Sequence, residues 1–76
     1  MVHVSMNGET MEITVNGERR EVPDGTSVQA LLKGLSLTGR RIAVEVNEDI
    51  IPRSRHAEHR LGDGDRVEII HAIGGG

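Results

Sequence analysis

The sequence predicts an α+β fold in which a sheet of four or five short strands packs against one helix. Two observations lead to this class. Segments that alternate apolar and polar residues lie on both sides of one segment with helical spacing, and Asn-Gly or Asp-Gly turns separate them. The length of 76 residues allows a single domain, which buries only about 60% of the surface that the unfolded chain exposes. The core is expected to be aliphatic, since the sequence has no Phe, Tyr or Trp.

The first two strands are expected to form a hairpin. Residues 11–15 alternate apolar and polar side chains, and the Asn16-Gly17 pair that follows favours the positive φ angles of a tight hairpin turn. Residues 19–22 should then return antiparallel to the first strand. Because this strand is complete without earlier residues, we expect residues 1–10 to be a disordered N-terminal extension, with an added edge strand as the alternative.

A helix is expected directly after the break made by Pro23-Asp24-Gly25. Thr26 as N-cap, followed by Gln29 three residues later, has the pattern of a capping box. The apolar residues recur at helical spacing and fall on one stripe, formed by Val28, Leu31, Leu32 and Leu35. Such an apolar stripe needs a sheet to cover it.

Two further strands are expected after the helix. Residues 42–46 place three β-branched residues on one face, and a turn at residues 47–49 leads to the short strand 50–51. Pro52 ends this short strand or confines it to an edge of the sheet, because proline has no N–H group to donate to a neighbouring strand.

An irregular segment precedes the last strand. Residues 53–60 are polar, with room for a single helical turn, and Leu61 is their one expected anchor in the core. A tight turn at residues 62–65 leads into the strand 66–71. Its core-facing residues are Val67 and Ile69. Strand alternation therefore turns Ile70 outward, where we expect it to contact a partner protein, with an incidental exposed residue as the alternative.

Composition excludes several classes of function. The net charge is -3, from nine basic and twelve acidic residues spread along the chain, so no basic stripe is present to neutralise nucleic-acid phosphates. The lack of aromatic residues removes the stacking platforms of single-strand binders. Without cysteine, the chain can form neither a disulfide nor a thiolate metal site. No apolar run approaches the length that spans a bilayer, and no secretory signal is recognisable, so we expect a cytoplasmic protein with no membrane partner.

The remaining polar clusters are expected to be structural. His56, His59 and His71 lack the spacing of a recurrent metal motif, and we expect them at the surface rather than in a zinc site. The acidic turn at residues 63–65 lacks the further ligands of a calcium loop. Five arginines are expected to form a solvated surface, with docking to an acidic partner as the alternative: Arg40, Arg41, Arg53, Arg55 and Arg60.

The most informative feature is the end of the sequence, Gly74-Gly75-Gly76. Because glycine has no Cβ, such a tail can enter a narrow active-site tunnel and present its terminal carboxylate there. From Ala72 onward the tail reaches about 17 Å when fully extended. We therefore expect residues 72–76 to be a flexible tail that carries the function, with a linker remnant or a frayed end as the alternative.

Together these motifs resemble the ThiS family, the small sulfur carriers of thiamine biosynthesis. The resemblance spans residues 11–76 and depends on the order and spacing of individually common motifs. Those motifs are Val15-Asn16-Gly17-Glu18, Val46-Asn47, Ile51-Pro52-Arg53-Ser54, Gly64-Asp65-Arg66-Val67-Glu68-Ile69 and His71-Ala72-Ile73-Gly74-Gly75-Gly76. The resemblance implies a β-grasp, ubiquitin-like fold in which a mixed sheet wraps one helix, with the sulfur-carrier domain at residues 11–71.

The resemblance also implies a sequence of reactions on Gly76. A ThiF-like adenylyltransferase, similar to ubiquitin-activating enzymes, adenylates the Gly76 carboxylate with ATP and magnesium. Sulfur from a cysteine desulfurase replaces AMP, and the thiocarboxylate donates its sulfur to a ThiG-like thiazole synthase. Partner contacts are expected at Gly75, Gly74, Ile73 and Ile70. The chain has no phosphate-binding glycine loop of its own, so we expect no bound cofactor and a protein cosubstrate rather than an enzyme.

Two other functions fit the same features. One is a sulfur carrier of another pathway, similar to the small subunit of molybdopterin synthase. The other is a ubiquitin-like binding module or protein modifier that carries no sulfur. The His71-Ala72-Ile73 approach to the glycines and the absence of aromatic residues favour the thiamine carrier.

Overall fold

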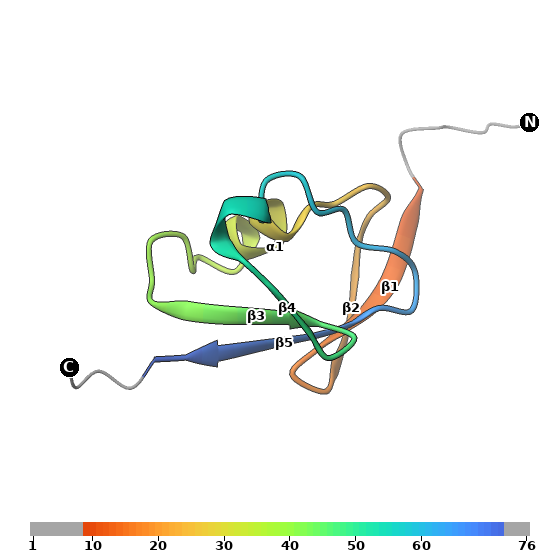
Figure 1. The fold of residues 1–76 in the computed structure, drawn as a ribbon. Helices are drawn as coiled ribbons and strands as arrows, with labels where there is room; N and C mark the ends of the chain where they lie inside the picture. Colours follow the sequence, from red (N-terminus) through yellow and green to blue (C-terminus); the bar gives the residue numbers. More distant parts are fainter. Residues whose placement is uncertain (1–8, 73–76) are drawn as a thin grey trace, which may run out of the picture.

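The computed structural model of the chain describes residues 9–72. Its elements, in chain order, are β1 (Thr10–Val15), β2 (Glu18–Pro23), α1 (Val28–Gly34), β3 (Ile42–Val46), β4 (Asp49–Ile51), a 3-10 helix (Arg53–Arg55) and β5 (Arg66–His71) (Figure 1). This is the predicted order. Residues 1–8 of the extension expected at residues 1–10 lie outside the described residues, and so do the tail positions 73–76. Within residues 9–72, no helix has the length and hydrophobicity to cross a membrane.

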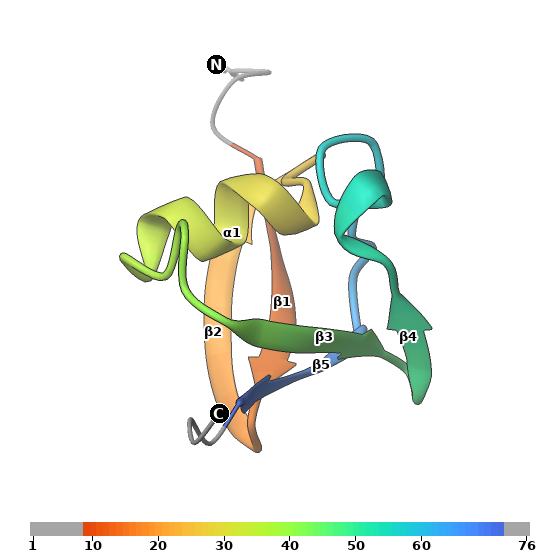
Figure 2. The same cartoon turned by 60° about the vertical axis from the view of Figure 1, so that its left-hand side comes forward.

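Five strands form one mixed sheet in the order β2-β1-β5-β3-β4. β1 runs parallel to β5, whereas the β1–β2, β3–β5 and β3–β4 pairs are antiparallel. The helix α1 lies across one face of the curved sheet, and β5 occupies the middle of the sheet (Figures 1 and 2). This arrangement confirms the β-grasp fold, with the short β4 as the fifth strand.

Both hairpins turn on residues with positive φ angles. Asn16 and Gly17 have φ values of 52° and 86°, as the first hairpin required. The second hairpin turns on Asn47 and Glu48, with φ values of 51° and 75°. Asp49, which was expected in this turn, instead pairs with Val46 as the first residue of β4. The expected three-residue turn was therefore one residue too long, because a two-residue turn with positive φ angles matches the twist of the strands.

The domain begins slightly earlier than its sequence predicts. Thr10 pairs with Pro23 at the edge of the sheet, and the Thr10 hydroxyl donates to the Glu21 carboxylate at 3.0 Å. The Glu9 carbonyl oxygen accepts the N–H of Asp24 at 3.1 Å. The first strand therefore includes Thr10, which the sequence assigned to the extension.

The helix is capped by Ser27 rather than by Thr26. The Ser27 hydroxyl accepts the N–H of Ala30 at 3.0 Å, and Ser27 has the extended backbone of an N-cap residue. The Thr26 hydroxyl instead donates to the Pro23 carbonyl oxygen. The capping-box prediction was wrong by one residue, because Ser27 and Thr26 are both good caps and Gln29 is only the second helical residue.

The core lies between α1 and the inner face of the sheet. Its buried side chains are Met11, Ile13, Val22, Val28, Leu31, Leu32, Val44, Val46, Ile51, Leu61, Val67 and Ile69. The predicted alternation is therefore correct in β1, β3 and β5. The predicted helix stripe is also correct, with Leu35 packed against the core from a partly buried position.

The segment between β4 and β5 has a second anchor that the sequence did not predict. His56 is only 8% exposed, and its Nε2 lies 2.9 Å from the carbonyl oxygen of Ile51. A carbonyl oxygen can only accept, so Nε2 is the donor. The expectation of a surface histidine was wrong for His56, and Leu61 is not the only anchor. A histidine within a polar run gives no periodic signal of burial.

Candidate functional site

The last strand leads directly to the glycine tail, and the sheet holds it from both sides. β5 pairs with β1 at its first two residues and with β3 from Val67 to His71. Beyond the strand, the Ala72 N–H donates to the Arg41 carbonyl oxygen at 3.0 Å. Because β3 pairs with β5 as far as His71 and Arg41 binds Ala72, the base of the tail is fixed relative to the folded body as far as Ala72.

Asn16 extends the contact between β1 and β5 past the end of β1. Its backbone N–H donates to the Val67 carbonyl oxygen at 2.9 Å. Its side-chain Oδ1 accepts the Ile69 N–H at 2.8 Å, and its Nδ2 donates to the Ile69 carbonyl oxygen at 3.4 Å. The side-chain amide thus replaces the backbone of a longer strand. Asparagine suits this position for two reasons: its amide forms these hydrogen bonds, and it tolerates the left-handed backbone of the turn.

Asn47 holds the start of β5 from the opposite side. Its Oδ1 accepts the N–H of Arg66 at 2.9 Å, and its Nδ2 donates to Oδ1 of Asp65 at 3.0 Å. Its backbone N–H donates to the Arg66 carbonyl oxygen at 2.7 Å. An asparagine from each hairpin turn therefore fixes β5, Asn47 at its first residue and Asn16 at Val67 and Ile69.

Sequence reasoning assigned these two asparagines only to turns. A further signal was present, because a Val-Asn pair ends β1 and another ends β3, at Val15-Asn16 and Val46-Asn47. That pattern indicates equivalent turns. It does not indicate which strand lies beside them, since both contacts with β5 join residues far apart in the sequence.

Ile70 is the one predicted site residue that the described part contains. It is 49% exposed on the sheet face opposite the helix, directly across from Ala43 of β3. Its outward orientation is confirmed, and its contact with a partner stays a prediction. The other predicted site residues lie outside the described residues: Ile73, Gly74, Gly75 and Gly76.

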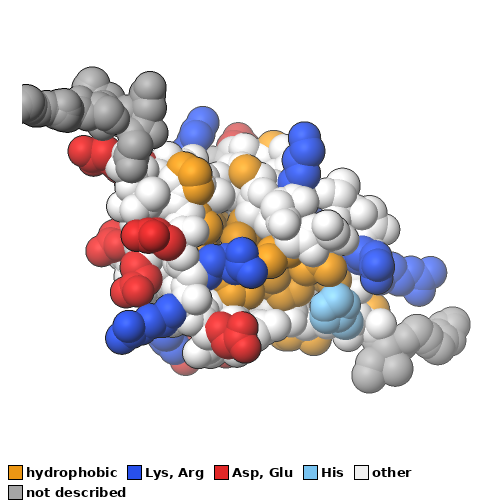
Figure 3. All heavy atoms as spheres, turned by 180° about the vertical axis from the view of Figure 1, so that it is seen from behind, with side chains coloured by type: hydrophobic (Ala, Val, Ile, Leu, Met, Phe, Trp, Pro, Cys, Tyr) orange, Lys and Arg blue, Asp and Glu red, His pale blue; other side chains and the backbone are white. Residues whose placement is uncertain are grey.

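An open hollow lies beside the C-terminal end of β5, on the helix side of the sheet. It has a volume of about 340 Å³, and it is lined by Val15, Asn16, Glu18, Arg20, Leu35, Leu37, Ile69 and His71. Figure 3 shows hydrophobic side chains gathered in the middle of this side of the molecule, with a basic side chain lying across them and further charged side chains around them. Val15, Leu35 and Leu37 are only partly buried. The core is thus less completely covered near the end of the sheet from which the tail leaves.

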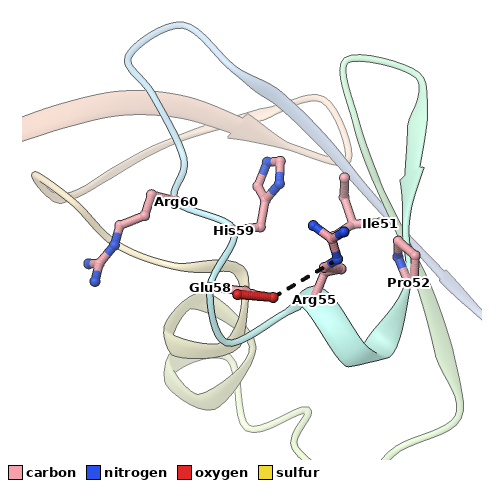
Figure 4. Close-up of a pocket in the computed structure, with 6 residues that line it drawn as sticks. All are labelled: Ile51, Pro52, Arg55, Glu58, His59 and Arg60. Carbon is pink, nitrogen blue, oxygen red and sulfur yellow. Dashed lines mark ion pairs between the residues drawn. The ribbon is translucent and has the colours of Figure 1, made fainter.

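A larger hollow of about 460 Å³ is lined by Ile51, Pro52, Arg55, Glu58, His59 and Arg60 (Figure 4). Its arginines already have partners. Arg55 Nε lies 3.9 Å from Glu58 Oε2, whereas Arg60 points away from the other five side chains and donates to the Gly25 carbonyl oxygen at 2.9 Å. None of the lining residues belongs to β5, so we assign this hollow no role in the chemistry of the tail.

The acidic turn before β5 has a structural role. Asp63 Oδ1 accepts the N–H of Glu12 at 2.8 Å, and Asp65 Oδ2 accepts the N–H of Gly62 at 2.8 Å. Both carboxylates therefore hold the turn, as predicted. Between residues 9 and 72, no group of three or more His, Asp and Glu side chains could hold a metal ion.

Comparisons with known proteins agree on one family for this chain. The model of the ThiS family matches residues 4–76. This match begins before residue 11, the predicted start of the resemblance. The sulfur carrier protein ThiS of Escherichia coli is 32% identical over 66 residues, which cover 87% of this chain and 100% of that protein. A thiazole synthase of Paramagnetospirillum magneticum is 42% identical over 66 residues. This match covers 87% of the present chain, which spans only 20% of that synthase.

Solved structures agree with the sequence comparisons. The crystal structure of the thiamine biosynthesis protein (ThiS) from Geobacter metallireducens superposes with a TM-score of 0.76 and has 32% sequence identity. The superposition covers 87% of this chain and 100% of that one. The similarity in fold is therefore accompanied by similarity in sequence over the same extent.

Proposed function

The chain belongs to the ThiS family of sulfur carrier proteins in thiamine biosynthesis, and we propose that the carboxylate of Gly76 is the group that carries the sulfur. Proteins of this family are carriers rather than catalysts. The observation that carries the proposal is the position of β5, a central strand that leads directly into the glycine tail.

The carboxylate must first be activated, because its negative charge repels nucleophiles. One oxygen of the Gly76 carboxylate attacks the α-phosphorus of ATP, pyrophosphate leaves, and a mixed anhydride with AMP forms. Persulfide sulfur from the desulfurase, reduced by a thiol to the oxidation level of sulfide, then attacks the carbonyl carbon, so that a C–S bond forms and AMP departs. The resulting thiocarboxylate is more acidic than an ordinary thiol, and its anionic sulfur is the nucleophile for the next transfer.

Three cytoplasmic partners supply what the chain lacks. A ThiF-like adenylyltransferase holds ATP and magnesium, a cysteine desulfurase provides the sulfur, and a ThiG-like thiazole synthase accepts it. Support for the last partner comes from the similarity between this chain and a segment of a thiazole synthase. The carrier contributes a recognisable folded body and a tail that fits the active sites of successive enzymes.

The geometry of the folded body suits such delivery. Asn16 and Asn47 fix β5, and the contact of Ala72 with Arg41 extends this support beyond the strand. The four residues that follow Ala72 can reach about 13 to 14 Å when extended. A partner enzyme that grips the body near Ile70 therefore has the Gly76 carboxylate within reach of a buried active site.

Intact-mass measurement tests the proposal directly. The purified chain is incubated with the adenylyltransferase, ATP, magnesium, cysteine, the desulfurase and a thiol reductant. We expect its mass to rise by the difference between one sulfur and one oxygen atom, and to return to its original value when thiazole synthase and its substrates are added. A mass that stays unchanged in the complete mixture contradicts the proposal.

Deletion of Gly76, or the substitution Gly75→Leu, should abolish ATP–pyrophosphate exchange by the adenylyltransferase. The first change moves the carboxylate, and the second widens the tail. Neither should change the melting temperature, because both lie beyond the last strand. The control is Gly34→Ala, at the end of α1, where an added Cβ meets nothing within 4 Å. Normal ATP–pyrophosphate exchange by the chain that lacks Gly76 would show that the tail takes no part in the mechanism.

The same reaction mixtures separate the alternative functions. A carrier of the molybdopterin type would pass its sulfur to the large subunit of molybdopterin synthase and not to thiazole synthase. A protein modifier would form an amide with an amine and would gain the mass of its target. Transfer of the sulfur to thiazole synthase, and to none of the other acceptors, supports the thiamine function.

A further inference from the structure

The outer face of the sheet, opposite α1, carries an apolar surface that the core does not use. Ile50 of β4 is 68% exposed and Ile70 of β5 is 49% exposed, and these are the two exposed large hydrophobic residues within residues 9–72. Register places them on the same face on opposite sides of β3, since Ile50 lies opposite Glu45, and Ile70 lies opposite Ala43 two residues along that strand. Exposed apolar side chains gathered on one face of a molecule are typical of interaction surfaces.

Two acidic side chains lie between these isoleucines. Glu45 of β3 and Glu68 of β5 are direct cross-strand partners. Residues paired in this way share one face of the sheet, with Cβ atoms about 4.5 to 5.5 Å apart, and like charges so placed lower stability. Neither carboxylate forms an ion pair with a described residue, and Arg66, two residues before Glu68 on the same face, pairs with Glu48 instead. No ion pair among residues 9–72 therefore compensates this repulsion.

A second glutamate pair on the same face is compensated. Glu12 of β1 and Glu21 of β2 are also direct cross-strand partners. Here, however, Glu12 lies 4.0 Å from Arg19, and Glu21 accepts a hydrogen bond from the Thr10 hydroxyl at 3.0 Å. Both pairs consist of two glutamates, so residue type alone does not distinguish them. Two features set the Glu45–Glu68 pair apart: it has no ion pair with a cation of the described part of the chain, and an exposed isoleucine lies beside each of its glutamates.

We infer that this outer patch, formed by Ala43, Glu45, Ile50, Glu68 and Ile70, is the surface that docks on thiazole synthase. The inference rests on the proposed function, and it specifies the chemistry of the partner surface. A Lys or Arg side chain of the synthase lies between the two glutamates, and apolar side chains receive the two isoleucines. A cation at this point removes the repulsion between Glu45 and Glu68, so binding gains energy that the free carrier lacks.

The position of the patch fits this role. Ile70 and Glu68 lie on β5, and Ile70 is only two residues before Ala72, where the tail begins. An enzyme that covers the patch therefore holds the strand that delivers the tail. The acceptor must keep the carrier in place while the sulfur is transferred, and a mixed acidic and apolar surface gives both orientation and contact area.

Calorimetric binding to purified thiazole synthase tests the inference with two matched double variants. Glu45→Gln with Glu68→Gln removes the uncompensated pair, and Glu12→Gln with Glu21→Gln removes the same charge from the same face elsewhere. We expect the Glu45/Glu68 double variant, the patch variant, to bind about tenfold or more weakly than the wild type. The Glu12/Glu21 double variant, the control variant, should change binding by less than about twofold. The first variant should also melt at the same temperature as the wild type or higher, because it relieves repulsion.

Salt dependence gives a second measurement. Binding of the wild type should weaken as NaCl rises from about 0.05 to 0.5 M, because salt screens the contact between the carboxylates and the partner cation. The patch variant should lose most of this dependence, and the control variant should keep it. The substitutions Ile50→Ser and Ile70→Ser should each weaken binding with little effect on its salt dependence.

Three results would overturn the inference: equal effects of the two double variants, unchanged binding by the patch variant, or no measurable complex between the wild-type carrier and the synthase. These results are distinguishable from failure of the proposed function. That failure appears as a wild-type chain that acquires no sulfur, whereas the binding experiment uses the unmodified carrier.

Discussion

At the scale of single residues, the base of the tail depends on one asparagine side chain. Asn16 donates to and accepts from the peptide group of Ile69, at a point where β1 has already ended. Without this amide, the Ile69 N–H and carbonyl would face the end of the hairpin with no partner from the sheet. The residue that shapes a turn thus also supports the strand that carries the functional tail.

The substitution Asn16→Gly separates the two roles, because glycine accepts the positive φ angle and offers no side chain. We expect the free energy of unfolding to fall by about 1 to 2 kcal/mol through the loss of two hydrogen bonds. Urea denaturation measures this change, and hydrogen exchange should become faster at Ile69. Asn47→Gly is the matched control, and its effect should fall on Arg66 instead. Unchanged exchange at Ile69 in the Asn16 variant would show that the amide contact contributes nothing.

At the scale of elements, the short helix depends on the segment that crosses its N-terminus. The carbonyl oxygens of His59 and His56 accept the N–H groups of Val28 and Gln29, each at 2.9 Å. These are donors that the first turn of any helix leaves without an internal partner. With only seven residues, α1 would be unstable alone, and this contact together with the Ser27 cap supports it.

Substitution of the cap tests this account. Ser27→Ala should lower the free energy of unfolding by about 1 kcal/mol, because the N–H of Ala30 loses its acceptor. Ser27→Asn keeps a side-chain oxygen and should cost much less. Chemical denaturation of the three proteins makes the comparison. Equal stability of the Ala and Asn variants would mean that the hydroxyl does not cap the helix.

At the scale of the whole molecule, β5 joins two hairpins that are otherwise separate. The β1–β2 hairpin and the β3–β4 hairpin are local structures, and the last strand enters the sheet between them. The core is complete only when this strand is in place, since Val67 and Ile69 contribute to the buried cluster from the centre of the sheet. The tail is thus attached to the part of the chain on which the whole sheet depends.

Truncation at the other end should show where the domain begins. Removal of residues 1–8 should change the free energy of unfolding by less than about 0.5 kcal/mol, because every described strand is kept. Removal of residues 1–10 should cost about 1 to 2 kcal/mol, since it deletes the contacts of Glu9 with Asp24 and of Thr10 with Glu21. Urea denaturation gives both values. Equal stabilities of the two shortened chains would place the start of the domain after Thr10.

The sequence by itself determined those features that depend on near neighbours. Strand alternation, the Asn16-Gly17 turn and the apolar stripe of the helix follow from backbone sterics and from the periods of strand and helix. The outward orientation of Ile70 follows from the same alternation. The ThiS family was also recognisable from the order and spacing of short motifs.

Only the tertiary structure decided the features that depend on which segments become neighbours. The sequence indicated neither that Asn16 and Asn47 would face β5 nor that His56 would be buried beside Ile51. It also did not reveal that Glu45 and Glu68 face each other between two exposed isoleucines. The physical reason is that strand pairing joins residues that are distant in the chain, so the surroundings of a polar side chain are fixed by sheet order and register rather than by its neighbours in the sequence.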